Sequence, residues 1–331
     1  MLEHGGNLND AVRRFGRPHA EWIDLSTGIN PQAYPVPVLA ANCWHRLPEP
    51  NQILIDAARM YYNAPHLIAV AGTQSAIRAL PRVRQPCRVV VAAPAYAEHA
   101  HQWQQAGHTV QEVGYDALAA SLPHCDVMVI CNPNNPTGAM VAPAVLLAWV
   151  EQLAARGGWL VVDEAFGDML PKHSVAAWSD RPGLIVLRSV GKFFGLAGLR
   201  LGFVAAHQTL LATLADFLGP WSVSGPAQQI GAAALADQPW QESMRAALMC
   251  AGERLHRLLA GHGINASGSA LYQWWPEAHA EAFSQHMAQH GIWVRLLRHG
   301  AIGIRLGLPY HEAHWQQLDA ALVKWSSKAR A

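Results

Sequence analysis

Three side chains that could hold a phosphorylated cofactor share one glycine-rich stretch near the middle of the chain. Ser189 lies three residues before Lys192, and Arg200 lies eight residues after that lysine. Upstream, Asp163 ends an apolar run, and Asn135 lies in Asn-Pro-Asn-Asn-Pro-Thr-Gly. A lysine that holds an aldehyde cofactor needs an acidic partner for the pyridine nitrogen and donors for a phosphate. The chain supplies all of these, so the set predicts pyridoxal phosphate (PLP) chemistry.

Secondary structure must bring these side chains together. Between about residues 65 and 210, apolar runs alternate with helical segments, which predicts an α/β fold with a mainly parallel sheet covered on both faces. Asn135, Asp163 and Ser189 all follow such runs closely, and ligands of parallel sheets bind where the strands end. The predicted strands are Val89–Ala93, Val127–Cys131, Leu160–Val162, Leu184–Leu187 and Leu201–Ala205, and the predicted helices are Thr73–Arg84, Tyr96–Gly107 and Pro143–Arg156.

The pattern changes after Gly225. A long helical run to about Gly261 precedes segments that read in the order strand, helix, strand, strand, helix, which predicts a smaller α+β domain. The expected segments are Leu271–Trp275, Glu277–His290, Trp293–Leu297, Ala301–Leu306 and His311–Lys324. We therefore expect a large domain over residues 40–220 and a second domain made of residues 1–39 and 221–331. The first 40 residues, rich in glycine, asparagine and proline, are expected to be irregular.

Composition narrows the class of protein. The 331 residues are 51% hydrophobic, and the net charge is +1, so no basic surface for a nucleic acid is expected. No apolar run approaches the roughly 20 residues that span a bilayer, and the first residues do not resemble a signal peptide. Five scattered cysteines without Cys-x-x-Cys spacing indicate reduced thiols and a cytoplasmic protein.

Eighteen histidines raise the question of a metal site. The densest group places His99 and His101 two positions apart in a helix-like stretch. Residues two apart on a helix point in different directions, so these rings do not converge on one ion. We expect both on a solvated helix face and predict no metal site.

With these motifs in order, the chain resembles the fold type I PLP-dependent enzymes, in particular the aminotransferase class I/II family. The resemblance covers nearly the whole chain and implies a seven-stranded large domain. It also implies that Lys192 carries the cofactor and that Asp163 pairs with the protonated pyridine nitrogen. Asn135 would donate to the ring 3-oxygen, and Tyr96 would stack on the ring.

The resemblance also assigns a phosphate site. Gly72 precedes a predicted helix, so Thr73 and Gln74 would present helix-start amides to the cofactor phosphate. Ser189 would add a hydroxyl, and Arg200 a fork of donors.

Two positions depart from the family pattern. Many aminotransferases have a tyrosine that hydrogen-bonds the ring oxygen, where this chain has Phe166. Many also have a tyrosine that reaches the cofactor phosphate of the partner subunit, where this chain has Leu47. The family still implies a homodimer.

Arginines near the end of the chain point to the substrate. Enzymes of this fold grip the substrate carboxylate with an arginine near the C-terminus, and Arg305 fits that position. Arg295 lies ten residues earlier on the preceding predicted strand. Two such arginines predict a substrate with two anionic groups, whereas Arg298 is expected at the surface.

The N-terminal segment makes the substrate more specific. His4 opens His-Gly-Gly-Asn, and Gly28 lies in Leu-Ser-Thr-Gly-Ile-Asn-Pro. Together the segments resemble the threonine-phosphate decarboxylases of cobalamin biosynthesis, in which the histidine helps to bind the substrate phosphate. The resemblance implies a phosphorylated amino acid as substrate. It also implies decarboxylation of L-threonine O-3-phosphate to (R)-1-amino-2-propanol O-2-phosphate, with Gly28 offering backbone contact only.

Two alternatives remain. An aminotransferase acting on a phosphorylated amine such as histidinol phosphate would use the same Lys192, Asp163, Asn135 and Arg200. A PLP-binding regulator would need an added DNA-binding domain, and the sequence has neither a basic helix-turn-helix pattern nor the length for one.

Overall fold

The alternating apolar runs form a seven-stranded sheet in the computed structural model, which describes residues 5–298 and 300–328. Its order is β2-β8-β7-β6-β5-β3-β4. All neighbours are parallel except β8, which runs antiparallel to β2 and β7. The strands are β2 (Leu67–Val70), β3 (Arg88–Ala92), β4 (Thr109–Val113), β5 (Val127–Cys131), β6 (Trp159–Asp163), β7 (Leu184–Ser189) and β8 (Gly202–Ala206).

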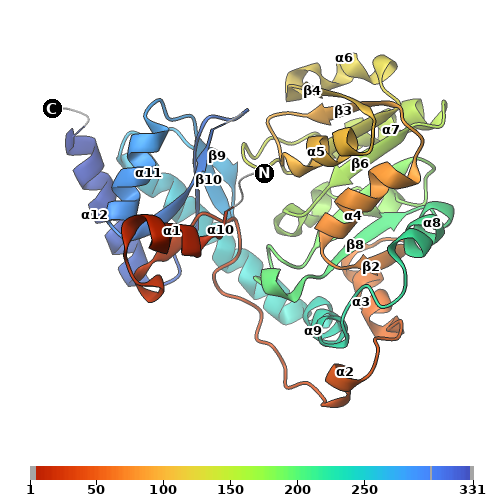
Figure 1. Ribbon diagram of the computed structural model, residues 1–331, viewed down its shortest axis with the longest axis horizontal. Coiled ribbons are helices and arrows are strands. Elements are labelled where there is room, and N and C mark those ends of the chain that lie inside the picture. Colours follow the sequence, from red (N-terminus) through yellow and green to blue (C-terminus); the bar gives the residue numbers. More distant parts are fainter. Residues whose placement is uncertain (1–4, 299, 329–331) are drawn as a thin grey trace. The chain divides into compact units, whose positions relative to one another are not determined.

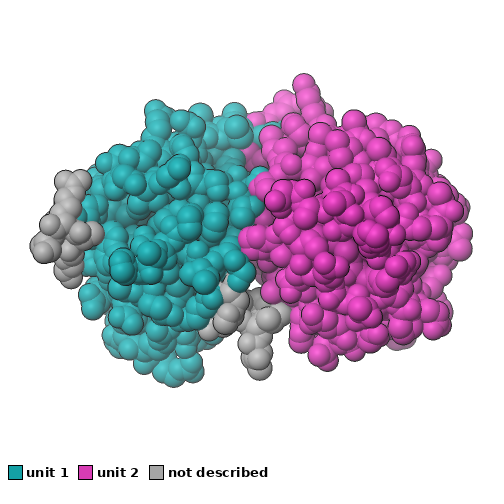
Figure 2. Space-filling view, turned by 90° about the horizontal axis from the view of Figure 1, so that it is seen from above, with its two compact units in different colours: residues 1–32, 136–138, 244–331 teal, residues 33–135, 139–243 magenta. Residues whose placement is uncertain are grey.

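Chain contacts divide the molecule into two units, coloured separately in Figure 2. Unit 2 contains residues 33–135 and 139–243, and it holds the seven-stranded sheet. Unit 1 contains residues 1–32, 136–138 and 244–331. Unit 2 thus extends beyond the predicted 40–220 at both ends. At the C-terminal end, the helix that follows Ser224 packs against a helix of the large unit.

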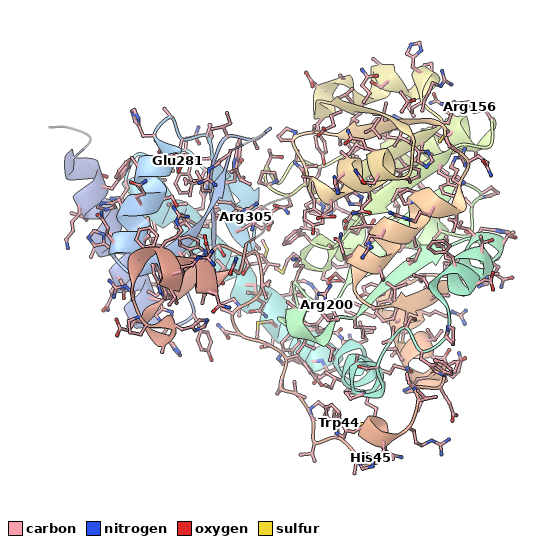
Figure 3. All side chains as sticks on the ribbon, in the orientation of Figure 1. Trp44, His45, Arg156, Arg200, Glu281 and Arg305 are labelled. Atoms are coloured by element: carbon pink, nitrogen blue, oxygen red, sulfur yellow. The ribbon has the colours of Figure 1, made fainter. Side chains whose placement is uncertain are left out.

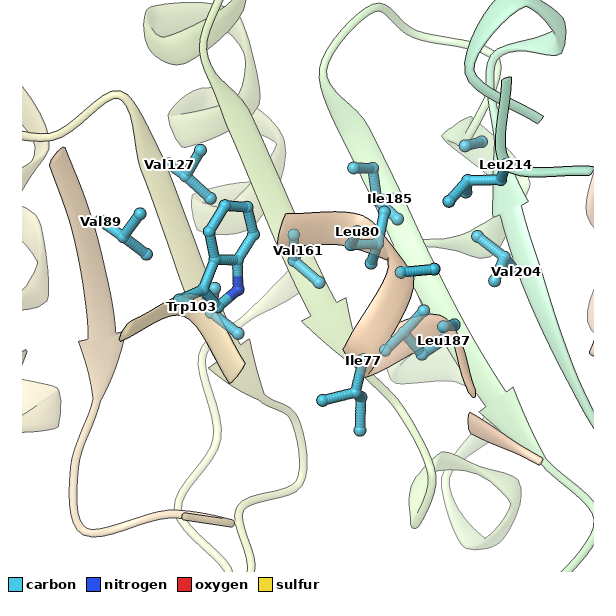
Figure 4. Packing of buried hydrophobic residues seen from close by; sticks show 14 of the residues in the cluster. Ile77, Leu80, Val89, Trp103, Val127, Val161, Ile185, Leu187, Val204 and Leu214 are labelled. Carbon is cyan, nitrogen blue, oxygen red and sulfur yellow. The ribbon is translucent and has the colours of Figure 1, made fainter. Parts of the chain in front are cut away.

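Helices cover the large sheet and bury both of its faces. Figure 4 shows one face, where Ile77, Leu80 and Trp103 from helices pack onto Val127 and Val161 from central strands. The helices of unit 2 are α2 (Asn42–His45), α3 (Gln52–Tyr62), α4 (Thr73–Ala79), α5 (Glu98–Gln105), α6 (Leu118–Ser121), α7 (Pro143–Ala154), α8 (Gln208–Leu218) and α9 (Gly225–Ala236). Alternate strand residues, such as Met128 and Val162, face the other way and are also fully buried, as a doubly covered sheet requires.

Unit 1 is built on a five-stranded sheet of order β1-β11-β12-β10-β9. The strands are β1 (Ile23–Leu25), β9 (Ser267–Ser269), β10 (Tyr272–Trp275), β11 (Ile292–Leu297) and β12 (Gly303–Gly307). The helices are α1 (Leu8–Phe15), α11 (Ala280–Gln289), α12 (Glu312–Lys328) and most of α10 (Gln238–Gly261), which Figure 1 labels. This arrangement confirms the predicted α+β character. In this sheet β1, from the N-terminal part of the chain, pairs in parallel with β11, from the C-terminal part.

The short segment 136–138 belongs to unit 1 although its neighbours in sequence belong to unit 2. A side chain at Gly138 would place its Cβ 2.0 Å from the carbonyl oxygen of Gly268 in β9. Glycine is therefore required here, and its φ of +74° is one that other residues rarely adopt.

Several expectations from the sequence are corrected. The first 40 residues are not wholly irregular, because they contain α1 and β1. The helical run before Gly261 is two helices, α9 and α10, separated at Asp237. The five strands predicted for the large unit are confirmed, whereas β2 and β4, at the two edges of its sheet, were not predicted.

Candidate active site

A cavity lies at the carboxyl ends of β5, β6 and β7, and the described residues that line it all belong to unit 2. It gathers every residue that the sequence assigned to the cofactor. These residues are Gly72, Thr73, Gln74, Tyr96, Asn135, Asp163, Ser189, Lys192 and Arg200. They are far apart in the sequence, and the parallel strands bring them together because their ends share one edge of the sheet.

Asp163 ends β6 and is 5% exposed. Its Oδ1 accepts the backbone N–H of Ala165 at 2.9 Å, and its Oδ2 lies 2.8 Å from Nε2 of His99. An ionised carboxylate can only accept, so Nε2 of His99 carries the proton and donates it. Both carboxylate oxygens are therefore held in place, and the buried charge has the partners that burial demands.

His99 corrects an expectation. The sequence placed it on a solvated helix face, but the ring is 1% exposed because α5 turns this side towards the sheet. His101, two positions on, is partly exposed. The two histidines could not be told apart from the sequence, since Asp163, the partner of His99, lies 64 positions away.

The same place holds a nitrogen, a sulfur and an oxygen within 4.8 Å of one another, from His99, Cys131 and Asp163. Three such ligands could hold a soft cation, a possibility that the sequence did not suggest. Burial, and then the nearby Asp163, raises the pKa of the Cys131 thiol well above its ordinary value. A thiol binds metal as the thiolate, which the raised pKa of Cys131 disfavours, and Nε2 of His99 already lies within hydrogen-bond distance of Asp163.

Lys192 lies in the turn after β7, and its Nζ is 5.4 Å from the centre of the Phe166 ring. The two residues that follow, Phe193 and Phe194, are fully buried. The Phe194 ring stacks on Trp240 at 5.6 Å, and the Phe194 carbonyl accepts the N–H of Tyr34. Buried aromatic packing on one side of the turn therefore fixes where the lysine enters the cavity.

Hydrogen-bond donors lie together where the cavity meets the start of α4. Gly72 precedes α4 with φ +72°, and an added Cβ would lie 2.6 Å from Nη2 of Arg200. The guanidinium thus lies against backbone that only glycine leaves open. Ser189 accepts the N–H of Gly191 at 3.1 Å, which leaves its hydroxyl hydrogen to donate. Thr73 begins α4, so its N–H points out of the helix start.

A series of side-chain hydrogen bonds holds Tyr96. Its hydroxyl donates to Oε1 of Gln74 at 3.2 Å, and Nε2 of Gln74 donates to Glu98 at 2.7 Å. Burial, with the negative charges of Glu98 and Asp163, raises the pKa of Tyr96 to about 12. The phenol therefore stays neutral, and its ring has a fixed orientation in the cavity.

These side chains fit PLP. The cofactor needs an amine for its aldehyde, a buried carboxylate for its pyridine nitrogen, a flat neighbour for its ring and donors for its phosphate. Lys192, Asp163 and Tyr96 provide the first three, and the glycine-lined cradle of Arg200 provides the last.

The predicted substrate arginines lie in unit 1 at opposite positions on two neighbouring strands. Arg295 of β11 is the direct partner of Arg305 in β12, so both side chains leave the same face of the sheet. Arg305 is 8% exposed and donates to the carbonyl of Ser26 at 2.8 Å. Burial lowers the pKa of Arg305 to about 10, and the like charge of Arg295 acts in the same direction.

The two N-terminal segments meet beside this arginine pair. The N–H of Gly6 donates to Oγ of Ser26 at 2.7 Å, and a Cβ at Gly5 would lie 2.4 Å from the Ser26 carbonyl. Gly28 is buried two residues further on. His4 lies outside the described residues.

The fold and the cavity define a class of protein. The aminotransferase class I and II family matches residues 47–302, and the chain belongs to that family. This membership confirms the predicted fold type I architecture with a mainly parallel seven-stranded sheet.

Individual relatives are more specific. A threonine-phosphate decarboxylase from Pseudomonas aeruginosa is 50% identical over 330 residues, covering 99% of each chain. Another from Sinorhizobium sp. is 40% identical over 331 residues, covering 98% of each. The crystal structure of a histidinol-phosphate aminotransferase from Sinorhizobium meliloti, in complex with PLP, superposes with a TM-score of 0.84. It is 21% identical and covers 99% of this chain and 96% of its own, so it shows a shared fold.

Proposed function

We propose that this chain is a PLP-dependent carboxy-lyase that converts L-threonine O-3-phosphate to (R)-1-amino-2-propanol O-2-phosphate and carbon dioxide. This reaction belongs to the aminopropanol arm of cobalamin biosynthesis. Full-length relatives of 50% and 40% identity carry the decarboxylase name. The structural observation that carries the proposal is the cross-strand arginine pair, the buried Arg305 and the half-buried Arg295, because a substrate with both a phosphate and a carboxylate needs two cationic partners.

PLP, when bound, supplies an electron sink for the pair of electrons that carbon dioxide leaves behind. Asp163, oriented by His99, would keep the pyridine nitrogen protonated. Asn135 and Tyr96 would hold the ring, and Arg200 with Ser189 would hold the cofactor phosphate. Lys192 has the role of moving a proton. After the Cα–carboxylate bond of the substrate breaks, Nζ of Lys192 would return a proton to the substrate Cα.

Orientation decides which substrate bond breaks. Decarboxylation needs the Cα–carboxylate bond perpendicular to the cofactor ring, whereas transamination needs the Cα–H bond there. Arg305 is suited to set this orientation, because its guanidinium is buried and already tied to the Ser26 carbonyl. Arg295 is less buried and would take the substrate phosphate, with Gly28 and His4 as further contacts.

The proposal includes a homodimer that works in the cytoplasm. Apolar side chains stand exposed on the segment 36–53 of unit 2, among them Leu47 at 63% and Trp44 at 66%. Trp44 is labelled in Figure 3. A groove lined by residues 42–43 and 46–53 together with Gly225, Gln228 and Gln229 lies beside these side chains, a surface that a second copy would cover. All five cysteines are free thiols, as a reducing compartment keeps them. No helix within the described residues is both long and apolar enough to cross a membrane. Sedimentation analysis tests the dimer, and a monomer at micromolar concentration would contradict it.

The direct test is to incubate the PLP-loaded protein with L-threonine O-3-phosphate, without a keto acid, and to measure carbon dioxide. Release that matches the aminopropanol phosphate formed is the expected result. The opposing result is no release together with turnover of histidinol phosphate once 2-oxoglutarate is added, which would identify an aminotransferase.

The arginine pair supplies a sharper test. We expect Arg295→Gln to raise the KM for L-threonine O-3-phosphate about tenfold to a hundredfold, since a charge-assisted hydrogen bond is lost. Arg298→Gln is the matched control, because Arg298 lies nearby on the same segment and pairs with Glu281 at 2.7 Å. Equal effects of the two substitutions would show that Arg295 does not meet the phosphate.

A further inference from the structure

One buried arginine holds both ends of the loop that lines the cavity after β6. Ala165 and Phe166 lie in that loop and line the cavity. The residues on either side of this part, Glu164 and Asp168, both turn away and bind Arg188 of β7. A single side chain thus closes a short loop whose inner surface faces the cofactor cavity.

The contact geometry is that of a fork. Nη1 of Arg188 donates to Oε2 of Glu164, and Nη2 donates to Oδ1 of Asp168 at 2.5 Å. The guanidinium also lies over the ring of Tyr62, 4.4 Å from its centre. The three charged side chains are between 1% and 3% exposed, so water does not screen them.

Other groups fix the loop ends further. Oε1 of Glu164 accepts the N–H of Val175 at 2.8 Å, and the Ser174 hydroxyl donates to Oε2, the oxygen that also binds Arg188. A Cβ at Gly167 would lie 2.9 Å from Nη1 of Arg188, so the glycine allows the loop to wrap closely round the guanidinium. The backbone is therefore shaped to this one arginine.

The charged residues Glu164 and Arg188 are sequence neighbours of cavity residues, and along each strand end neighbouring side chains point in opposite directions. Glu164 follows Asp163, and Arg188 precedes Ser189, yet Asp163 and Ser189 line the cavity while their charged neighbours do not. Strands β6 and β7 are hydrogen-bonded neighbours, with Asp163 opposite Leu187. Displacement of Arg188 would therefore move cavity residues on both strands.

The free-energy cost of burying Arg188 favours a role in positioning its neighbours over a role in stabilising the fold. Burial of an arginine with two carboxylates is costly, and apolar side chains of similar volume often give equal or greater stability. Burial raises the pKa of Glu164, which reflects that cost. A fork that binds two carboxylates does, however, define positions that apolar packing leaves loose.

We propose that Arg188 is a positioning residue that holds Asp163 and Phe166 at the cofactor, through Glu164 and Asp168. The inference rests on the proposed function, because it takes the cavity to be a PLP site. It assigns to Arg188 no contact with cofactor or substrate.

The test compares Arg188→Met, Arg188→Lys and the triple variant Arg188→Met, Glu164→Gln, Asp168→Asn with the wild-type holoenzyme. The readouts are the PLP dissociation constant, the visible circular dichroism of bound PLP, and thermal unfolding of the apo forms. Arg181→Met is the matched control, because Arg181 precedes the same strand and forms an exposed pair with Glu151 at 3.1 Å. The triple variant removes the buried charges together, which separates lost geometry from an unpaired buried charge.

We expect Arg188→Met and the triple variant to weaken PLP binding about tenfold or more and to reduce the dichroism, as a displaced active-site group does. Arg188→Lys keeps the charge without the fork and should recover part of both. If Arg188→Met does not fold, the other two variants decide. Variants that lower the unfolding temperature but bind PLP with unchanged affinity and dichroism would overturn the inference. Wild-type protein that binds PLP yet releases no carbon dioxide would overturn the proposed function instead.

Discussion

At the scale of single residues, the site depends on a carboxylate whose direction is fixed before any ligand arrives. Asp163 accepts from a backbone N–H on one oxygen and faces Nε2 of His99 on the other. A side chain held in this way loses little rotamer freedom when the pyridine nitrogen binds. His99 would thus act through Asp163, and its effect should be visible in cofactor binding.

Replacement of His99 by phenylalanine keeps a ring in the buried space but removes the donor to Asp163. We expect the PLP dissociation constant to rise about tenfold, in the range that lost outer-shell partners cause at metal sites. A PLP titration followed by absorbance measures this. His101→Phe, on the same helix, is the control, and equal affinities for the two variants would contradict the role.

The raised pKa of Tyr96 gives a prediction about alkaline pH. The pKa of Tyr96 in the folded state, about 12, lies above the ordinary tyrosine value of 10.0, so the folded state keeps its phenol proton to higher pH than the unfolded chain does. Stability from this group is complete below about pH 10 and is lost as the pH rises towards about 12. We expect the wild type to lose about 1–2 kcal/mol more than Tyr96→Phe across that window, after allowance for partial exposure. Urea midpoints at the two ends of the window measure it, and parallel losses would refute the shift.

The residues around Lys192 were predictable because each belongs to a short local pattern. Lys192, Asp163 and Asn135 are read from contiguous motifs, and the cavity brings them together. His99 and Arg188 were missed because their partners are distant in sequence and their types alone indicate no chemistry. Only burial reveals them, and burial depends on packing that one sequence does not display.

At the scale of elements, the ends of strands and the starts of helices do the positioning. The turn into α4 illustrates this, because Gly72 provides both a left-handed backbone and room for Arg200. A residue with a Cβ at this position strains the backbone and also displaces the guanidinium.

Gly72→Ala should therefore have two separable effects. The backbone strain costs about 1 kcal/mol of stability, and displacement of Arg200 should weaken PLP binding about tenfold. Gly157→Ala is the control, since its φ is +70° but nothing lies within 4 Å of the added Cβ. Thermal unfolding and PLP titration of both variants measure the effects. If the control weakens PLP binding equally, the displacement of Arg200 is not the cause.

Strands in the middle of the large sheet were predictable, and those at its edges were not. β5 is buried at every residue and reads as one apolar run. β4 is an edge strand in which exposed and half-buried residues mix, so it lacks the continuous apolar signal. β1 has three residues, and its partner β11 lies near the other end of the chain. Such a short strand exists only because tertiary pairing stabilises it.

At the scale of the whole molecule, every described residue that lines the cofactor cavity belongs to unit 2. Unit 1 contains the arginine pair and the N-terminal glycines Gly5 and Gly6. The two groups of residues can therefore be perturbed and observed separately.

PLP alone should stabilise the molecule unevenly. At a hundredfold excess over the dissociation constant, ligand binding adds about 2.7 kcal/mol. We expect slower amide hydrogen exchange in the segments that line the cavity, such as 132–135 and 163–168, and unchanged exchange in β11 and β12. Exchange mass spectrometry with and without PLP tests this. Equal protection in both units would contradict it, and Lys192→Ala should reduce the protection.

The pairing of β1 with β11 also has a consequence for how the chain is made. A ribosome that adds about 5–20 residues per second delivers β11 on the order of ten to fifty seconds after β1. All of residues 33–243 emerge during that interval, so the large sheet can assemble while the first strand still lacks its neighbour. Nascent chains should therefore present the apolar N-terminal segment around Trp22 to chaperones until synthesis is nearly finished, and truncation before Ile292 should prolong that association.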